Sequence, residues 1–269
     1  MGFISPCEVE DYDFTYSLKS LRLRSGGHTL SAEARQLLQN MLKKTQGIVL
    51  GAIRYKETSI IVKIFTRELG LKSYLVNGVR TQGNKSKIAL YQPLTLLELV
   101  VYDKDTAGLQ RISEAQLHRA HQLIPFDFTR TGIALFITEV ISKSIYENYQ
   151  NESLFDFLKE CIIHLDSKEV HLGQFPLVFL IEKASYLGFA PQEALGFLSE
   201  SRSQPFSVSE LTQAENYLAA LMSSSFSNEA KIGKTLRQKL LDHLLDFYSQ
   251  HLDNPGNWKS LVILRQLNG

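Results

Sequence analysis

The spacing of apolar residues changes once along the chain, close to Ile124 and Pro125. Before this point apolar and polar residues alternate, which is typical of half-buried β-strands. After it the apolar residues recur every three or four positions, which is the period of an amphipathic helix. We therefore expect an α+β protein in which a β-rich segment precedes an all-α segment.

Five segments between Gln46 and Ala120 have the character of strands. The residues that alternate on one face are Ile48, Leu50 and Ala52 in the first segment and Ile60, Val62 and Ile64 in the second. The other segments are 71–76, 94–102 and 109–117. Five strands without a long helix between them predict a small closed barrel, the OB-fold, whose usual ligands are oligonucleotides.

The second part of the chain predicts a bundle of helices. The first apolar stripe consists of Ile133, Phe136, Ile137, Val140, Ile141, Ile145 and Tyr149. Further helices are expected over 154–165, 174–187, 209–223, 233–252 and 258–267. We predict three parts: an N-terminal extension (1–40), an OB-fold domain (41–122) and an α-helical domain (123–269).

Residues 1–40 continue neither pattern. The run Met41-Leu42-Lys43-Lys44-Thr45 resembles the start of a bacterial chain directly before a strand. We expect that translation begins at Met41 or that the first forty residues form a mobile tail. The alternative is that they add a short helix, over about 32–39, to the fold.

The net charge of +1 conceals a division between the two parts. Residues 41–124 contain 13 Lys or Arg and 6 Asp or Glu, a net charge of +7. Residues 125–269 contain 12 basic and 17 acidic residues, a net charge of −5. This division suggests a polyanion-binding domain joined to a scaffold or partner-binding domain.

Composition excludes several classes of protein. No apolar run approaches the ~20 residues of a membrane-spanning helix, and the N-terminus lacks the basic start and apolar core of a secretory signal. The two cysteines, Cys7 and Cys161, cannot form a disulfide framework or a four-cysteine metal site. We expect a cytoplasmic protein without a membrane partner.

The segment from Gly78 to Ser86 resembles a phosphate-binding P-loop. It has one extra residue, Asn84, which displaces Lys85 from the phosphates that a P-loop lysine must reach. The motif also needs a helix directly after it, and here the chain runs toward Pro93 and a strand. We interpret it as an inter-strand loop rather than a nucleotide-hydrolysis site.

No other motif predicts catalysis or a cofactor. His118 and His121 could meet on one helical turn, but no third ligand with metal-like spacing lies nearby. Cys161 falls in an apolar helix and reads as a small core residue. We expect a protein that is not an enzyme and that uses no metal, cofactor or small-molecule substrate.

Basic and aromatic residues of the β-rich part predict a nucleic-acid interface. Single-strand binders combine cations for the phosphates with aromatic faces for the bases. The candidate DNA-binding residues are Arg80, Lys85, Lys87, Arg54, Lys56, Lys63, Lys72 and Tyr74. Phe65 ends an apolar strand, and we therefore expect it in the core.

Several segments together resemble the RecO family of bacterial DNA repair proteins. In the β-rich part these are Thr45–Leu50, Tyr55–Thr66, Glu68–Arg80 and Gln92-Pro-Leu-Thr-Leu-Leu-Glu-Leu. In the helical part they are Tyr186-Leu-Gly-Phe-Ala-Pro191, Leu236-Arg-Gln-Lys-Leu-Leu, Tyr248–Leu252 and Lys259-Ser-Leu. The resemblance covers about residues 41–267.

This resemblance implies a recombination mediator without enzymatic activity. Such proteins bind single- and double-stranded DNA, anneal complementary strands, and help to load RecA onto DNA coated by the single-strand-binding protein SSB. Their partners are RecR and the acidic C-terminal tail of SSB, and we expect association with the nucleoid. Arg80, Lys85 and Lys87 fall in the basic loop after the third strand of the family.

The chain departs from some family members in one respect. Those members carry a four-cysteine zinc site after the Leu-Gly-aromatic-x-Pro turn, whereas residues 192–209 here contain no cysteine. We therefore predict no zinc. An acidic SSB tail needs basic residues at the rim of its pocket. The candidates are Arg130, Lys143, Lys183, Arg237 and Lys239.

Two alternatives remain open from the sequence. The first is an OB-fold RNA-binding protein whose helical part docks on a ribonucleoprotein, which a strong RNA preference through 2′-hydroxyl contacts would support. The second is an ATPase that uses the loop at Gly78. Absence of ATP binding would exclude this second alternative.

Overall fold

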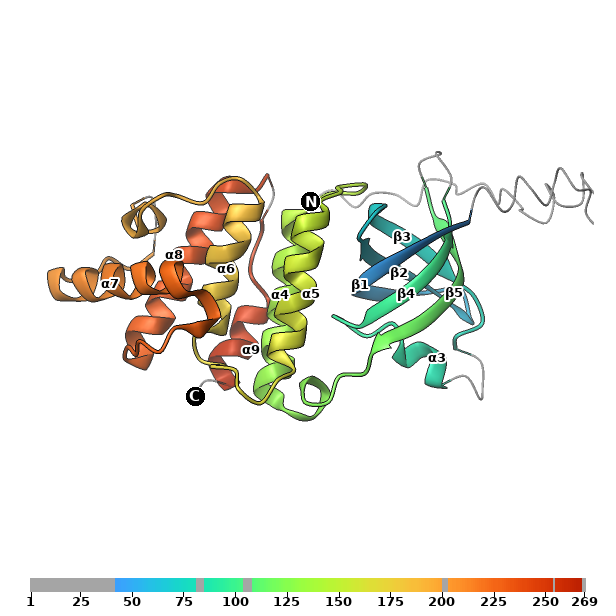
Figure 1. Ribbon diagram of the computed structural model, residues 1–269, viewed down its shortest axis with the longest axis horizontal. Coiled ribbons are helices and arrows are strands. Elements are labelled where there is room, and N and C mark those ends of the chain that lie inside the picture. The colour runs from blue at the N-terminus through green and yellow to red at the C-terminus, as the bar shows by residue number, and fades with distance from the viewer. Residues whose placement is uncertain (1–41, 81–84, 104–107, 200–202, 254, 268–269) are drawn as a thin grey trace, which may run out of the picture.

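A computed structural model describes residues 42–80, 85–103, 108–199, 203–253 and 255–267. A β-barrel lies on one side of the molecule and a group of helices on the other, with α4 and α5 between the barrel and the remaining helices (Figure 1). The extension predicted over 1–40 lies outside the described residues. No helix in the described ranges is both long and apolar enough to cross a membrane.

The barrel is a closed five-stranded OB-fold, as predicted. Its strands are β1 (Leu42–Tyr55), β2 (Ser59–Thr66), β3 (Gly70–Val76), β4 (Leu96–Tyr102) and β5 (Gln110–Arg119). They are paired in the closed order β1-β2-β3-β5-β4, in which β3 and β5 are parallel over a short stretch and the other pairs are antiparallel. This order is that of a Greek-key barrel, which the short β3–β5 pairing closes.

A β-bulge in β1 changes which side chains face the barrel axis. The register with β2 shifts between Val49 and Gly51, so that two residues of β1 occupy the space of one. Ile48 and Leu50 therefore point toward the helices, whereas Ala52 pairs with Val62, a residue of the barrel interior. The prediction that Ile48, Leu50 and Ala52 share one face is wrong, because alternation cannot anticipate the extra residue.

The second part of the chain is all α-helical, as predicted. The helices are α4 (Phe128–Ser144), α5 (Glu152–Leu165), α6 (Phe175–Tyr186), α7 (Val208–Ser224), α8 (Lys234–His251) and α9 (Ser260–Leu267). Short 3-10 turns are η1 (Ile124–Phe126), η2 (Ala194–Phe197) and η3 (Ser225–Ser227). A five-residue helix, α3 (Lys85–Ala89), precedes β4.

The helix α3 was not expected, since the sequence predicted a direct run toward a strand. It is a single turn, and Leu90 and Tyr91 donate backbone hydrogen bonds to Lys87 and Ile88 as the turn closes. One argument against a P-loop, the absence of a following helix, therefore does not hold. The extra residue Asn84, which lies outside the described residues, remains the argument against it.

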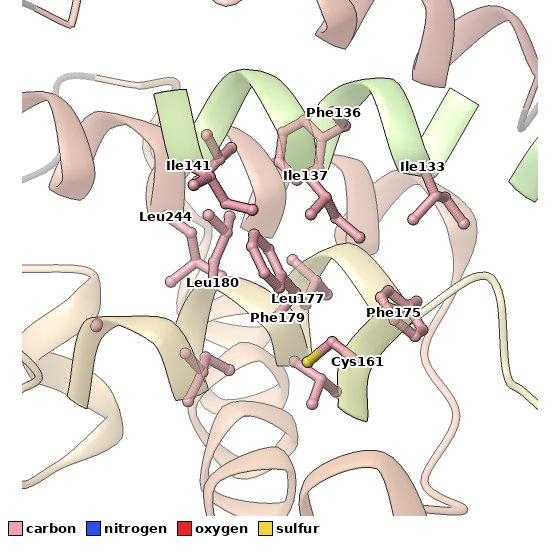
Figure 2. Close-up of a cluster of buried hydrophobic side chains, with 14 of the residues drawn as sticks. Ile133, Phe136, Ile137, Ile141, Cys161, Phe175, Leu177, Phe179, Leu180 and Leu244 are labelled. Atoms are coloured by element: carbon pink, nitrogen blue, oxygen red, sulfur yellow. The ribbon is translucent and has the colours of Figure 1, made fainter. Parts of the chain in front are cut away.

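Two apolar cores are present. The smaller one fills the barrel and includes Val62, Ile64, Leu97 and Leu99. The larger one lies among the helices, where residues of α4 face α6 and α8 (Figure 2). Phe65, Leu71 and other barrel residues belong to the larger core, so the outside of the barrel contributes to it. Phe65 lies in the core, as predicted, with its ring centroid 5.9 Å from that of Phe155.

The barrel and the helices are joined by backbone hydrogen bonds at β3. The Leu71 N–H donates to Tyr149 O (2.9 Å), and the Asn148 N–H donates to Leu71 O (2.7 Å). The loop after α4 therefore pairs with the start of β3 like a short additional strand. Gly70 has a φ of +73°, and a Cβ at this position would lie 2.5 Å from Tyr149 O. Only glycine fits this approach.

Two polar contacts also fix the orientation of the barrel relative to the helices. The Arg67 guanidinium donates to both carboxylate oxygens of Asp156 at 2.8 and 2.9 Å and lies 2.8 Å from Glu152. The hydrogen bond with Asp156 raises the pKa of Arg67 and lowers the pKa of Asp156. The buried Asp166 carboxylate accepts the N–H groups of Gln122, Leu123 and Ile124 at 2.8–2.9 Å. This second contact holds the segment between β5 and α4, which we call the elbow (residues 120–128).

Candidate nucleic-acid interface

Three predicted basic residues meet at the tip of the β1–β2 hairpin. Arg54 and Lys56 are exposed there, and Arg80 comes from the segment after β3. The Arg80 N–H donates to Thr58 O (3.1 Å), and its Nη1 donates to Lys56 O (3.2 Å). The backbone of Lys56 is left-handed (φ +49°), and its Nζ lies 5.5 Å from the centroid of the Tyr55 ring. Three cations from two separate segments therefore form one group, which we call the hairpin tip.

An apolar row lies next to the hairpin tip on the outside of the barrel. Ile53 pairs with Ile61, which pairs with Leu75, and Leu75 pairs in turn with Arg111 of β5. Ile53 is 65% exposed, and Ile61 and Leu75 are half-buried. The sequence analysis did not identify this row or Arg111. Ile61 lies between Ile60 and Val62, which were predicted to share one face of the strand, so alternation alone would have placed Ile61 on the opposite face.

The charge of the outer face differs between the two sides of the barrel. On the β1–β3 side, Lys63 occupies an outward position opposite Gly51 and Ser73. The helices cover the end of this side that carries Phe65 and Leu71, and Glu147 accepts the Ser73 N–H (3.0 Å). Glu57, which is exposed, is the carboxylate of the hairpin. On the other side, β4 and β5 present Glu98 and Glu114 together with Arg111 and Arg119, so their formal charges cancel. Phosphate groups are therefore attracted more strongly to the β1–β3 side.

The helix α3 adds Lys87, which is exposed. Its neighbour Lys85 begins this helix, and its side chain lies outside the described part of the structure. Both residues follow Arg80 in the chain, between Val79 and Tyr91, which are buried in the barrel core. The predicted basic loop is therefore anchored on either side by core residues.

Two predicted DNA-binding residues are not placed to contact a nucleic acid. Tyr74 is fully buried inside the barrel, and burial raises the pKa of its phenol. Its ring points into the barrel, whereas base stacking requires a ring on the outer surface. Lys72 lies on the same inward face and contacts Asp103 at 2.5 Å, with its side chain 15% exposed. Its charge is therefore largely neutralised within the fold.

The predicted SSB-tail residues are spread over three helices. Arg130 is buried and donates to Leu165 O, and Lys183 is fully buried with its Nζ 5.0 Å from the centroid of the Tyr248 ring. Lys143 contacts Glu139 (3.0 Å) and Lys239 contacts Glu210 (3.0 Å). Arg237 is half-buried, and its guanidinium borders Gly173. Arg130 and Lys183 are therefore too buried to lie at the rim of a pocket.

The histidines considered as a pair do not share a helical turn. His118 belongs to β5, where its Nδ1 lies 2.7 Å from Glu98, and the His121 ring contacts Leu94 O at 3.0 Å. Within the described residues, no group of three His, Cys, Asp or Glu side chains is placed to hold a metal ion. Cys161 is buried in the helical core, as predicted.

Comparison with known proteins identifies both parts of the chain. The family model of the recombination protein O N terminal matches residues 41–121, and that of the C terminal matches residues 125–260. DNA repair protein RecO of Flavobacterium psychrophilum is 36% identical over 234 residues, which are 83% of this chain and 98% of the relative. DNA repair protein RecO of Bacteroides fragilis is 31% identical over 240 residues, 84% and 99% of the two chains. The chain therefore belongs to the RecO family of DNA repair proteins.

Proposed function

We propose that this protein binds single- and double-stranded DNA through the hairpin tip and the β1–β3 side of the barrel. It anneals complementary strands and helps to load RecA onto SSB-coated DNA together with RecR. It catalyses no covalent step, needs no cofactor, and acts in the cytoplasm, in association with the nucleoid. This proposal extends the family assignment to particular activities and residues.

The observation that supports the DNA-binding surface is the grouping of Arg54, Lys56 and Arg80 beside the apolar row. In OB-folds, oligonucleotides bind on the face of the second and third strands and at the loop between the first two strands. The hairpin tip is that loop, and Lys63 lies on that face. Such cations attract a nucleic-acid strand of any sequence, because binding to the phosphates releases counterions.

This arrangement suits annealing because it holds a strand by its phosphates. The guanidinium and ammonium groups at the hairpin tip neutralise part of the charge that keeps two strands apart. Ile53 and its neighbours offer apolar contact area without the donors and acceptors that read base edges. The Watson–Crick edges of the bound strand therefore stay available to a complementary strand.

For the SSB tail we propose the helical domain, with Arg237 as the first residue to test. Of the five candidates, Arg130, Lys143 and Lys239 already have hydrogen bonds or ion pairs within the fold, and Lys183 is fully buried. Arg237 is half-buried on α8, where a carboxylate of the tail can reach a guanidinium.

The test is annealing of complementary oligonucleotides that have been coated with SSB, without any nucleotide. We expect clear acceleration over the control with SSB alone. An Arg54→Ala, Lys56→Ala, Arg80→Ala variant should lose the acceleration and keep its circular dichroism spectrum. Annealing at the SSB-only rate by the wild-type protein would contradict the proposed function.

A comparison with RNA tests the alternative hypothesis that this is an RNA-binding protein. Oligonucleotides of one sequence are compared as DNA and as RNA in the same binding assay. We expect comparable or stronger binding of DNA, since the proposed contacts are made to phosphates. A strong preference for RNA would require contacts to the 2′-hydroxyls and would favour the alternative.

A further inference from the structure

Two phenylalanines at the elbow are exposed to an unusual extent. Phe126 is 82% exposed and Phe128 is 83% exposed, whereas most phenylalanines of the described chain lie in the larger core. Exposing two neighbouring aromatic rings to water is unfavourable unless something else covers them. The sequence analysis assigned no role to these residues.

The backbone that carries these rings is firmly held. Asp166 accepts three N–H groups of the preceding residues, Gln122 to Ile124, and the Thr131 hydroxyl donates to Ile124 O (2.7 Å). Asp127, between the two rings, caps α4 by accepting the N–H groups of Thr129 and Arg130. The rings are therefore presented on a rigid segment, which lowers the entropic cost of binding.

An exposed cation, Arg119, lies at the end of β5, just before the elbow. The neighbouring His118 and His121 have partners within the fold, Glu98 (2.7 Å) and Leu94 O (3.0 Å). The Asp127 carboxylate is engaged by α4 and by Arg130 (3.4 Å). Exposed rings beside a cation are a combination found where single-stranded nucleic acids bind.

The elbow lies on the same side of the molecule as α3 (Figure 1). The helix α3, which carries Lys87, and the segment from β5 to α4 both run along the lower side of the molecule in Figure 1. The chain passes from the barrel to the elbow through Leu117 and Arg119, both of which are exposed.

We propose that Phe126 and Phe128 form a second contact for single-stranded DNA, on which bases of the strand stack after it leaves the barrel. This inference rests on the proposed function, because the barrel supplies the first contact. It adds to that function a contact with the bases rather than with the phosphates. The elbow binds single strands only, since stacking on the rings requires unpaired bases.

The first test compares a Phe126→Ala, Phe128→Ala variant with the wild-type protein on an oligonucleotide of about 30 nucleotides, longer than one OB-fold covers. A stack on one ring corresponds to about 5- to 150-fold in Kd, so we expect a rise of at least about fivefold. The slope of log Kd against log salt should stay unchanged, because no phosphate contact is lost. Tyr146→Ala, which removes another exposed aromatic ring (73%), is the matched control.

The second test observes the stack directly. Trp258 is the single tryptophan of the chain, so a Phe128→Trp variant in a Trp258→Phe background reports on the elbow alone. We expect its fluorescence to be quenched by the oligonucleotide and much less by an abasic strand of equal length.

Unchanged affinity of the double alanine variant together with unquenched fluorescence would overturn the inference and point to a protein partner. Failure of the wild-type protein to bind any oligonucleotide would instead contradict the proposed function, and the elbow inference with it.

Discussion

The basic residues of the barrel and those of the helical domain have different surroundings. At the hairpin tip, Arg54 and Lys56 are exposed. In the helical domain, Lys143 contacts Glu139 and lies 4.4 Å from the centroid of the Trp258 ring, and Lys239 contacts Glu210 and lies 4.8 Å from the Phe206 ring. Arg54 and Lys56 therefore remain exposed, although Lys56 also lies over the Tyr55 ring, whereas Lys143 and Lys239 are half-buried and paired with carboxylates.

This difference shows why the number of basic residues is a poor guide to a binding site. A cation that is paired within the fold has little potential left to attract a phosphate. Lys72 shows this within the barrel itself, since it contacts Asp103. The candidate surface is therefore defined by strand register and by local partners, more than by the net charge of +7.

The largest expected effect concerns the junction between the two regions. Gly70→Ala introduces a Cβ 2.5 Å from Tyr149 O at a φ of +73°. We expect the free energy of unfolding to fall by about 4 kcal/mol, from backbone strain and overpacking together. Urea denaturation measures this loss. Gly78→Ala is the control: its φ is +70° but no atom lies within 4 Å of the added Cβ, so it should cost about 1–2 kcal/mol. Equal losses would show that the junction is not tight.

The next effect concerns the charged surface. Replacing Arg54, Lys56 and Arg80 by alanine removes the hairpin tip cations, and we expect the Kd for single-stranded DNA to rise by about 10- to 100-fold at moderate salt. Fluorescence anisotropy with a labelled oligonucleotide measures the change. Replacing the exposed helical-domain residues Lys168, Lys231 and Lys234 removes the same charge and should change the Kd less than threefold, by about 0.6 kcal/mol. Similar losses in both variants would place the binding surface elsewhere.

A smaller effect is expected from the buried Lys183. Burial lowers the pKa of this amine well below the usual lysine value, and its Nζ has no hydrogen-bond partner. Lys183→Met should raise the free energy of unfolding at pH 7 by about 2 kcal/mol. Between the lowered pKa of the folded state and the ordinary lysine pKa, the unfolded chain binds a proton here that the folded chain lacks. Stability should therefore rise with pH up to the ordinary lysine pKa, and this rise should be weaker in Lys183→Met. Destabilisation by methionine would contradict this account.

The smallest effect concerns the attachment of α9. Burial alone would raise the pKa of Glu139, but hydrogen bonds from Ser260, Lys259 and Lys143 lower it to about 2. Glu139→Gln should lower the free energy of unfolding at pH 7 by about 1.5 kcal/mol. Because the folded pKa is depressed, this contribution is present above pH ~4.5 and is lost as the pH falls toward ~2. Wild type and variant should therefore converge in acid. The fluorescence of Trp258, next to α9, is a local readout, and the exposed Glu160→Gln is the control.

Much of the architecture could be predicted from periodicity, although the first helical stripe was extended too far: α4 ends at Ser144, and Tyr149 lies in the loop that pairs with β3. Helices α5, α6 and α8 lie within one or two residues of their predicted ranges. The alternation of apolar and polar residues could not predict the position of the β-bulge in β1. The extra residue between Val49 and Gly51 exchanges the faces of β1 and places Ala52 on the side of Val62.

The candidate site was less predictable because it depends on contacts between distant segments. Arg80 joins Arg54 and Lys56 only through its hydrogen bonds to the β1–β2 hairpin. Tyr74 and Lys72 were expected at the surface, but register with Val62 and Ile64 turns both toward the barrel axis. The exposure of Phe126 and Phe128 has no signal in the sequence, because apolar residues near a helix start usually enter the core.

The most direct test of the central claim is the salt dependence of oligonucleotide binding. The claim is that phosphates are held by the hairpin tip, so the slope of log K against log salt counts those contacts. For a single strand, the loss of three contacts should flatten the slope by about 2 in the Arg54→Ala, Lys56→Ala, Arg80→Ala variant. The Lys168, Lys231 and Lys234 variant should keep the wild-type slope. An unchanged slope in the hairpin tip variant would contradict the account.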